Sequence, residues 1–159
     1  MNEKLREPND QLLSYQTQRF QDLMEETVQC CQTRTLFLSR KFDLPQAELR
    51  CLMLFLGERY LTVKTISQKL DVAKSRVTKI IEGLMRRKLV ERIEDPRDGR
   101  VKLITLTPEG HKKSKEMGEF IRELHEKILL ELLPDERKVV LSSLEMLRSS
   151  MEAIKEQLY

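Results

Sequence analysis

Basic and hydroxyl side chains cluster at the start of one amphipathic segment, where they could hydrogen-bond to nucleic-acid bases and phosphates. In residues 74–84 the apolar positions recur at helical spacing and are Val77, Ile80, Ile81 and Leu84. Arg, Lys, Ser and Thr side chains donate to base edges and phosphate oxygens, and a helix with such a face fits the major groove. We therefore predict base reading by Ser75, Arg76, Thr78 and Lys79, with Lys74 on phosphate.

A charged turn between two β-branched segments follows this helix. Residues 89–93 and 101–106 are rich in Val, Ile and Leu, which favours two strands. Residues 95–100 between them read Asp-Pro-Arg-Asp-Gly-Arg, and Pro, Asp and Gly favour a tight reversal. The segment is therefore predicted to be a β-hairpin with a cationic tip, the wing of a winged helix.

The wing tip pairs each arginine with a nearby aspartate. We expect Arg97 to enter a narrow minor groove, with Arg100 supporting it or touching phosphate. Asp95 and Asp98 are interpreted as wing support that holds the arginine side chains through charge-assisted hydrogen bonds.

Two short helices are predicted to position this reading unit. Residues 63–70 place Val63, Ile66 and Leu70 on one face, and Thr62 precedes them as a cap and as a second phosphate contact. Residues 46–57 form a bracing helix, and the residues expected to face inward are Leu49, Leu52, Met53 and Leu56. A helix, a turn and a longer helix followed by a wing make a winged helix-turn-helix.

Residues 61–107 resemble the MarR family of bacterial regulators. The motifs that carry the resemblance are the Asp95-x-Arg97-Asp98-x-Arg100 wing and the run Leu106-Thr107-Pro108-x-Gly110. The resemblance implies a dimeric winged-helix protein that often releases DNA on binding a small molecule or on oxidation.

The sequence departs from the family pattern at both ends of the recognition helix. Lys88 stands where the family usually has glycine, and a left-handed conformation there would cost about 1 kcal/mol. Ala73 stands where a serine or threonine cap is common, and Asp71 is the alternative cap.

The positive charge is concentrated on the same segment. Residues 64–102 hold 12 Lys and Arg against 6 Asp and Glu, whereas the rest of the chain holds 17 against 20. A local basic excess attracts the phosphate backbone. The other interpretation is an ordinary solvated helix surface, and the wing motif argues against it.

Apolar seams run along the terminal segments. The seam of the first helix, from about Gln11, comprises Phe20, Met24, Thr27, Cys31, Thr35, Leu38 and Phe42. The seam of the last comprises Val140, Leu144, Leu147, Met151, Ile154 and Leu158, as in a coiled coil. An intramolecular three-helix bundle could cover these seams, but we predict that they interlock with a second copy. A two-fold dimer would then read a pseudo-palindromic operator.

The cysteines and histidines leave two interpretations open. Each cysteine is either a small apolar side chain in a core or, for Cys30 and Cys31, a thiolate that senses oxidant. The adjacent pair points about 100° apart on a helix, so we do not expect an internal disulfide. His111 and His125 lie far apart with no clustered ligands, so no metal site is predicted.

The fold class predicted is mainly α with a small β-wing. We expect an N-terminal dimerisation helix (1–44), a winged helix-turn-helix DNA-binding domain (45–107) and C-terminal dimerisation helices (108–159). The predicted function is a homodimeric, sequence-specific transcriptional regulator, a repressor, that binds double-stranded DNA and responds to a small aromatic ligand or an oxidant. The alternative is a winged-helix protein-interaction module that does not bind DNA.

Other function classes lack support in the sequence. No phosphate-cradling glycine loop, nucleophile elbow or metal spacing indicates an enzyme or a cofactor. No apolar run approaches the ~18 residues that span a bilayer, and the N-terminus lacks the apolar core of a signal peptide. We therefore expect a cytoplasmic protein.

Overall fold

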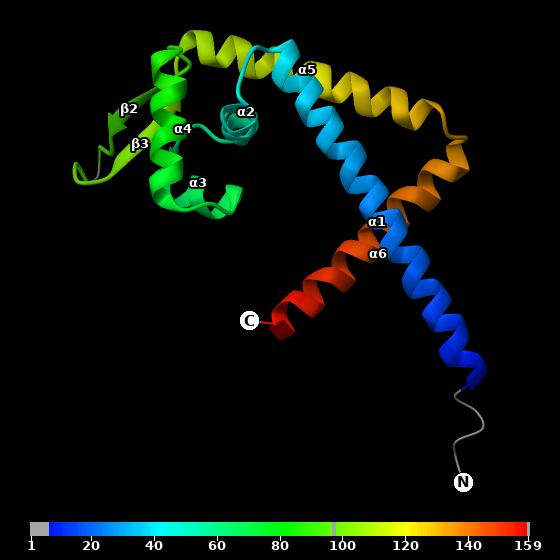
Figure 1. Cartoon of the computed structure of the whole chain (residues 1–159). Coiled ribbons are helices and arrows are strands. Elements are labelled where there is room, and N and C mark those ends of the chain that lie inside the picture. The colour runs from blue at the N-terminus through cyan, green and yellow to red at the C-terminus, as the bar shows by residue number, and fades with distance from the viewer. Residues whose placement is uncertain (1–6, 97, 159) are drawn as a thin grey trace. The chain divides into compact units, whose positions relative to one another are not determined.

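The computed structural model describes residues 7–96 and 98–158 and is mainly helical (Figure 1). The elements in chain order are α1 (Glu7–Lys41), α2 (Gln46–Met53), a 3₁₀ turn (Leu54–Leu56), β1 (Leu61–Thr62), α3 (Val63–Leu70), α4 (Lys74–Arg86), β2 (Val90–Glu94), β3 (Lys102–Leu106), α5 (Pro108–Leu130) and α6 (Pro134–Leu158). The fold class predicted from the sequence, mainly α with a small β-wing, is confirmed. No helix in the described part of the chain has the length and apolar character that crossing a membrane requires.

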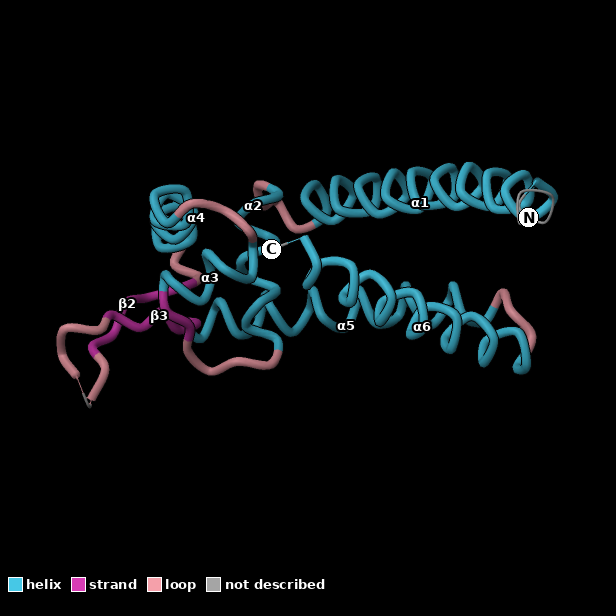
Figure 2. The backbone as a smooth tube through the Cα atoms, turned by 90° about the horizontal axis from the view of Figure 1, so that it is seen from below, coloured by secondary structure: helices cyan, strands magenta, loops and turns pink. Residues whose placement is uncertain are grey.

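The described strands form one antiparallel sheet in the order β1, β3, β2. Figure 2 shows β2 and β3 side by side as the hairpin of the wing, and their register pairs Val90 with Leu106 and Glu94 with Lys102. The strand β1 was not predicted, because its two residues were assigned to the start of the following helix. Its pairing of Leu61 with Ile104 joins the helix-turn-helix to the wing.

The core of the winged domain is built from the predicted apolar faces. The buried residues of α3 and α4 are Ile66, Leu70, Val77, Ile80, Ile81 and Leu84, and β2 and β3 add Val90, Ile104 and Leu106. Burial of these side chains is the main stabilising contribution to the domain, since each is worth about 1.5–3 kcal/mol when fully removed from water.

One inward position of the bracing helix was predicted wrongly. Leu56 is 49% exposed, whereas its neighbour Phe55 is 5% exposed and lies in the core. The helix tightens to 3₁₀ geometry over Leu54–Leu56, which advances about 120° per residue instead of about 100°. The change of pitch turns Phe55 inward. Leu49 and Leu52 are buried as expected.

Among the described residues, non-glycine residues with positive φ follow the ends of α1, α3 and α4. They are Asp43 (φ 50°), Asp71 (φ 53°) and Lys88 (φ 59°). The left-handed conformation expected at Lys88 is therefore confirmed, and the Leu89 N–H bonds back to the Leu84 carbonyl at 3.0 Å. Asp71 ends α3, so its expected role as cap of the recognition helix is wrong. The N-cap of α4 is Ala73, and no described side chain makes a capping hydrogen bond there.

The start of α5 is packed tightly against the end of the recognition helix. Thr107 Oγ1 accepts the Gly110 N–H at 3.0 Å, which caps α5, and donates to the Lys88 carbonyl at 2.6 Å. A Cβ at Gly110 would overlap the Leu89 carbonyl oxygen, so glycine is required by close backbone approach.

The chain divides into two compact units, one ending at His111 and the other beginning at Lys112. In the second unit the turn before α6 is fixed by Arg137, whose Nε donates to the Leu129 and Leu132 carbonyls at 2.6 and 3.0 Å. Glu136 Oε2 accepts the Leu133 N–H at 2.7 Å. The three-part domain division inferred from the sequence stays a prediction.

Candidate nucleic-acid interface

The recognition helix α4 presents its polar side chains to solvent. Lys74, Ser75, Arg76 and Lys79 are not buried, while Val77 between them is buried against the domain. Thr78 is half-buried, and its hydroxyl donates to the Lys74 carbonyl at 3.1 Å. Lys74, Ser75, Arg76, Thr78 and Lys79 therefore share one helix whose apolar face is anchored in the domain. Their roles stay predictions.

Thr62 begins α3 as expected. Its Oγ1 accepts the Thr65 N–H at 3.0 Å and lies 2.9 Å from Thr65 Oγ1. Replacing such a cap by alanine typically costs about 1 kcal/mol. The half-buried hydroxyl lies at a helix N-terminus, the end that favours anions, and its predicted phosphate contact is compatible with this position.

Hydrogen bonds to the backbone hold the wing tip, and the Asp98 carboxylate makes one of them. Asp98 Oδ1 accepts the backbone N–H of Arg100 at 3.0 Å, and the Val101 N–H donates to the Asp98 carbonyl at 2.9 Å. The Asp95 N–H donates to the Val101 carbonyl at 3.0 Å. Asp98 thus shapes the turn through both its carboxylate and its backbone carbonyl, and Arg100 is exposed. Arg97 lies outside the described residues, so the expected pairing of its side chain stays a prediction.

An ion pair closes the wing where the turn begins. Lys102 Nζ donates to Glu94 Oε1 across the strands, at the position where the two residues are in register. This hydrogen bond, and then the charge of Lys102, lower the pKa of the Glu94 carboxyl. The pair helps to keep the two strands in register near the tip.

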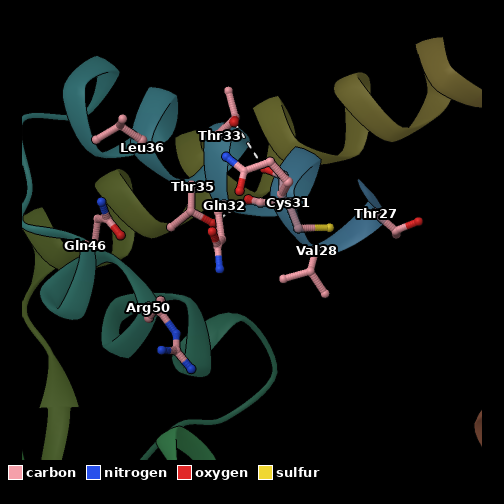
Figure 3. Close-up of a pocket in the computed structure, with 10 residues that line it drawn as sticks. Thr27, Val28, Cys31, Gln32, Thr33, Thr35, Leu36, Gln46 and Arg50 are labelled. Carbon is pink, nitrogen blue, oxygen red and sulfur yellow. Dashed lines mark hydrogen bonds between the residues drawn. The ribbon is translucent and has the colours of Figure 1, made fainter. Parts of the chain in front are cut away.

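A cavity of about 650 Å³ lies between α1 and α2 (Figure 3). The side chains of α1 that line it include Thr27, Val28, Cys31, Gln32 and Leu36, and α2 contributes Gln46 and Arg50. Arg50 makes no ion pair with any described carboxylate, so its charge is available to an anionic ligand. Sequence reasoning did not identify Gln46 or Arg50, because the turn that brings α2 beside α1 cannot be read from helical periodicity.

The cysteines fall into two classes. Cys30 and Cys31 are exposed in the single chain, and Cys31 lines the cavity. Cys51 is completely buried, and burial, followed by the charge of Glu48, raises the pKa of its thiol to about 12. The interpretation of a small apolar core residue therefore applies to Cys51. The redox role predicted for Cys30 and Cys31 stays a prediction.

The titratable groups do not assemble a metal site in the described part of the chain. No cluster of three or more His, Cys, Asp or Glu there is placed to hold an ion. His111 is exposed, like His125, in agreement with the expectation of surface side chains.

Apolar surface of the terminal helices is open to solvent in the single chain, although Leu38 in the predicted α1 seam is buried. On α1 the exposed large apolar side chains include Phe20 in the seam and Leu23, Val28 and Phe37 outside it, and on α6 they include Leu144, Met151 and Ile154. Exposed apolar surface on this scale marks an interaction site in a soluble protein.

This combination of helix-turn-helix, three-stranded sheet and exposed basic recognition helix defines a winged helix-turn-helix protein. Residues 42–101 match the MarR family. The HTH-type transcriptional regulator YsmB of Bacillus subtilis, described as uncharacterized, is 36% identical over 70 residues. That match spans 42% of this chain and 48% of the relative, about half of its length. Over residues 42–101 this chain is therefore similar to the winged helix-turn-helix of the MarR family.

Solved structures extend the likeness of fold beyond the winged domain. The transcriptional regulator Tm0710 of Thermotoga maritima is 25% identical, with a TM-score of 0.61 over 86% of this chain and 96% of that one. Streptococcus pneumoniae FabT, solved in complex with DNA, is 20% identical, with a TM-score of 0.75 over 85% of this chain and 99% of that one.

Proposed function

We propose that this chain is a homodimeric, sequence-specific DNA-binding transcriptional regulator that acts as a repressor. The observation that carries the proposal is the exposed basic face on the first turns of α4, presented by the same unit as the wing. The basic excess of residues 64–102 supplies the electrostatic attraction. A winged-helix module for protein contacts, the alternative, would not need this excess. The DNA complex of FabT, a protein of the same fold, supports the proposal.

Dimerisation is proposed from the open seams of α1 and α6. A second copy of the same chain offers matching apolar surfaces by symmetry. Two recognition helices would then contact half-sites about one DNA turn apart in a pseudo-palindromic operator.

The roles of the reading residues are proposed as the sequence suggests. Ser75, Arg76, Thr78 and Lys79 contact base edges, Lys74 and Thr62 contact phosphate, and the wing places Arg97 in the minor groove with Arg100 supporting it or touching phosphate. Asp95 and Asp98 support the wing.

Salt-titrated binding to duplex DNA flanking the coding region tests the proposal. Arg76→Ala and Arg97→Ala should each weaken binding by about 1–3 kcal/mol, and Lys74→Ala should reduce the salt slope by about 1. Arg40→Ala is the matched control, because Arg40 is exposed but lies on α1. Failure of the wild-type protein to bind any duplex in dilute salt would leave the protein-interaction module as the better account.

The response to an effector is proposed for the cavity between α1 and α2. Its size suits a small molecule, Arg50 offers a cation to the carboxylate of an aromatic acid, and Cys31 offers a thiol to an oxidant. A ligand that favours a spacing of the recognition helices unsuited to the operator weakens DNA binding, and DNA weakens ligand binding equally.

Binding assays with and without aromatic acids and peroxide test the effector response. Arg50→Ala should abolish release by aromatic acids, and the double variant Cys30→Ser and Cys31→Ser should abolish release by peroxide. Release by peroxide that persists in the double variant would remove these cysteines from the mechanism.

A further inference from the structure

One arginine joins the end of the recognition helix to the elements that precede it. Arg87, the C-cap of α4, has its Nε 3.0 Å from Glu48 Oε2 on α2. Its Nη1 donates to the Asp43 carbonyl at 3.1 Å and lies 3.7 Å from Asp43 Oδ2, at the turn that ends α1. A single guanidinium thus contacts both α2 and the α1–α2 turn.

The Glu48 carboxylate is held more tightly than a surface carboxylate. Its side chain is 13% exposed, compared with 97% for Asp43. Oε2 is buried and accepts no well-directed hydrogen bond from any described group, so the charge of Arg87 is what compensates its loss of hydration. The Glu48 end of the pair is therefore shielded from water, although the Arg87 side chain is 39% exposed.

Glu48 also touches the backbone of the recognition helix. A Cβ at Gly83, in the last turn of α4, would overlap Glu48 Oε1. Glycine in a helix interior costs about 1 kcal/mol relative to alanine, and here it permits the carboxylate to lie directly against the helix. The contacts of Glu48 with Gly83 and Arg87 therefore fix α4 relative to α2.

The joint, meaning the contacts of Glu48 with Gly83 and Arg87, lies toward the C-terminal end of α4, whereas the residues of α4 proposed to touch DNA lie in its first turns. Arg87 follows Lys79, the last of these residues, by 8 positions, about 12 Å along a helix of 1.5 Å rise per residue. A change at the joint would therefore alter the direction of the recognition helix without removing a DNA contact.

We infer that the joint of Glu48 with Gly83 and Arg87 positions the recognition helix relative to α1 and thereby sets the half-site spacing that the dimer accepts. The inference rests on the proposed function, because spacing has meaning only for a dimer on DNA. Arg87 is on this account a positioning residue: it orients the side chains that read DNA and makes no contact with DNA itself.

Operators whose half-sites are moved apart by single base pairs test the inference on the full-length protein. Each added base pair rotates one half-site by about 35° relative to the other, so a rigid dimer should discriminate strongly. We expect the wild-type protein to lose about tenfold in affinity for a one-base-pair change, a loss comparable to that of a mismatched base pair. Arg87→Ala should reduce this penalty to less than about threefold while leaving the salt slope unchanged.

Two further variants separate positioning from stability. Gly83→Ala displaces the flexible end of Glu48 but favours the helix, so it should stay folded and relax the spacing preference as Arg87→Ala does. Arg86→Ala removes the same charge from the adjacent exposed residue and should retain the wild-type preference. If Arg87→Ala fails to fold, the spacing preference of Gly83→Ala tests the inference.

Several outcomes would overturn the inference. A folded Arg87→Ala or Gly83→Ala variant with the wild-type spacing preference would show that the joint does not set the spacing. A lower salt slope in Arg87→Ala would make Arg87 a phosphate contact. Absence of duplex binding by the wild-type protein would remove the proposed function itself, whereas normal wild-type binding with unchanged variants removes only the inference.

Discussion

The winged domain and the terminal helices carry similar apolar periodicity, but they bury it to different extents. In the winged domain Leu84 is completely buried, whereas Leu144 on α6 is 56% exposed. The apolar faces of the winged domain are covered by other elements of the same compact unit. The apolar face of α6 is left exposed within the single chain. Apolar periodicity thus shows which face of a helix must be buried, but it does not show whether an element of the same chain or another molecule buries it.

The largest expected effect is a loss of stability of the winged domain. Leu84→Ala should lower the free energy of unfolding by about 3 kcal/mol, because it removes buried methyl groups and leaves a cavity. Chemical denaturation at several protein concentrations measures it. The loss should not depend on concentration, whereas the loss caused by Leu144→Ala should grow on dilution if a second copy covers that side chain. A concentration-independent loss in both variants would contradict the difference between the two regions.

A smaller effect is expected on association. Met151→Asp places a charge in the open seam of α6 and should raise the dissociation constant of the dimer by about 100-fold, since a buried unpaired carboxylate costs several kcal/mol. Sedimentation velocity measures the oligomeric state, and far-UV circular dichroism verifies that the chain remains helical. Ser149→Asp adds the same charge to an exposed position off the seam and is the control. An unchanged dimer in Met151→Asp would show that this seam is not the interface.

A gain in stability is expected at the end of the recognition helix. Lys88→Gly should raise the free energy of unfolding by about 1 kcal/mol, because glycine adopts the φ of 59° without a Cβ clash. Lys88→Ala removes the same charge but keeps the Cβ, so it should give no comparable gain. Thermal unfolding compares the three proteins. Equal gains in both variants would assign the effect to charge.

The reactivity of Cys51 tests whether the core of the winged domain is closed to solvent, without any substitution. Cys51, in the winged domain, should resist iodoacetamide at pH 8 in the folded protein and react only on unfolding, because its thiol is buried and its pKa is about 12. In the unfolded chain the thiol has its ordinary pKa of 9.0, so its contribution to stability is complete below pH 9.0 and is lost as the pH rises toward about 12. Mass spectrometry locates the modified residues. Rapid alkylation of Cys51 at pH 8 would show that the core opens locally.

The local elements of this fold could be predicted from the sequence because their signals are local. Thr62 and Thr107 act as caps, and the Asp-Pro-Arg-Asp-Gly-Arg turn lies between two strands, as their residue types indicate. Asp71 was misassigned because an aspartate after a helix can either cap the next helix or adopt the left-handed conformation that ends the previous one. Local sequence does not distinguish these two uses.

The parts that could not be predicted depend on contacts between distant residues. Arg50 lines the cavity only because the turn at Asp43 folds α2 back beside α1. Glu48 and Arg87 are 39 positions apart, and each alone resembles an ordinary charged residue on a helix surface. Gly83 was not singled out from the sequence, although a glycine inside a helical pattern costs about 1 kcal/mol relative to alanine and can therefore indicate a packing requirement.

The hydroxyl of Thr107 has a consequence for how the protein can be divided into fragments. This hydroxyl donates to the Lys88 carbonyl and accepts the Gly110 N–H. A polypeptide truncated at position 107 would therefore lack the second of these hydrogen bonds. Truncation after His111 would retain it and coincides with the boundary of the first compact unit. An isolated winged helix-turn-helix fragment for spectroscopy should therefore extend through His111 and not end before Pro108, where helical periodicity alone would place the boundary.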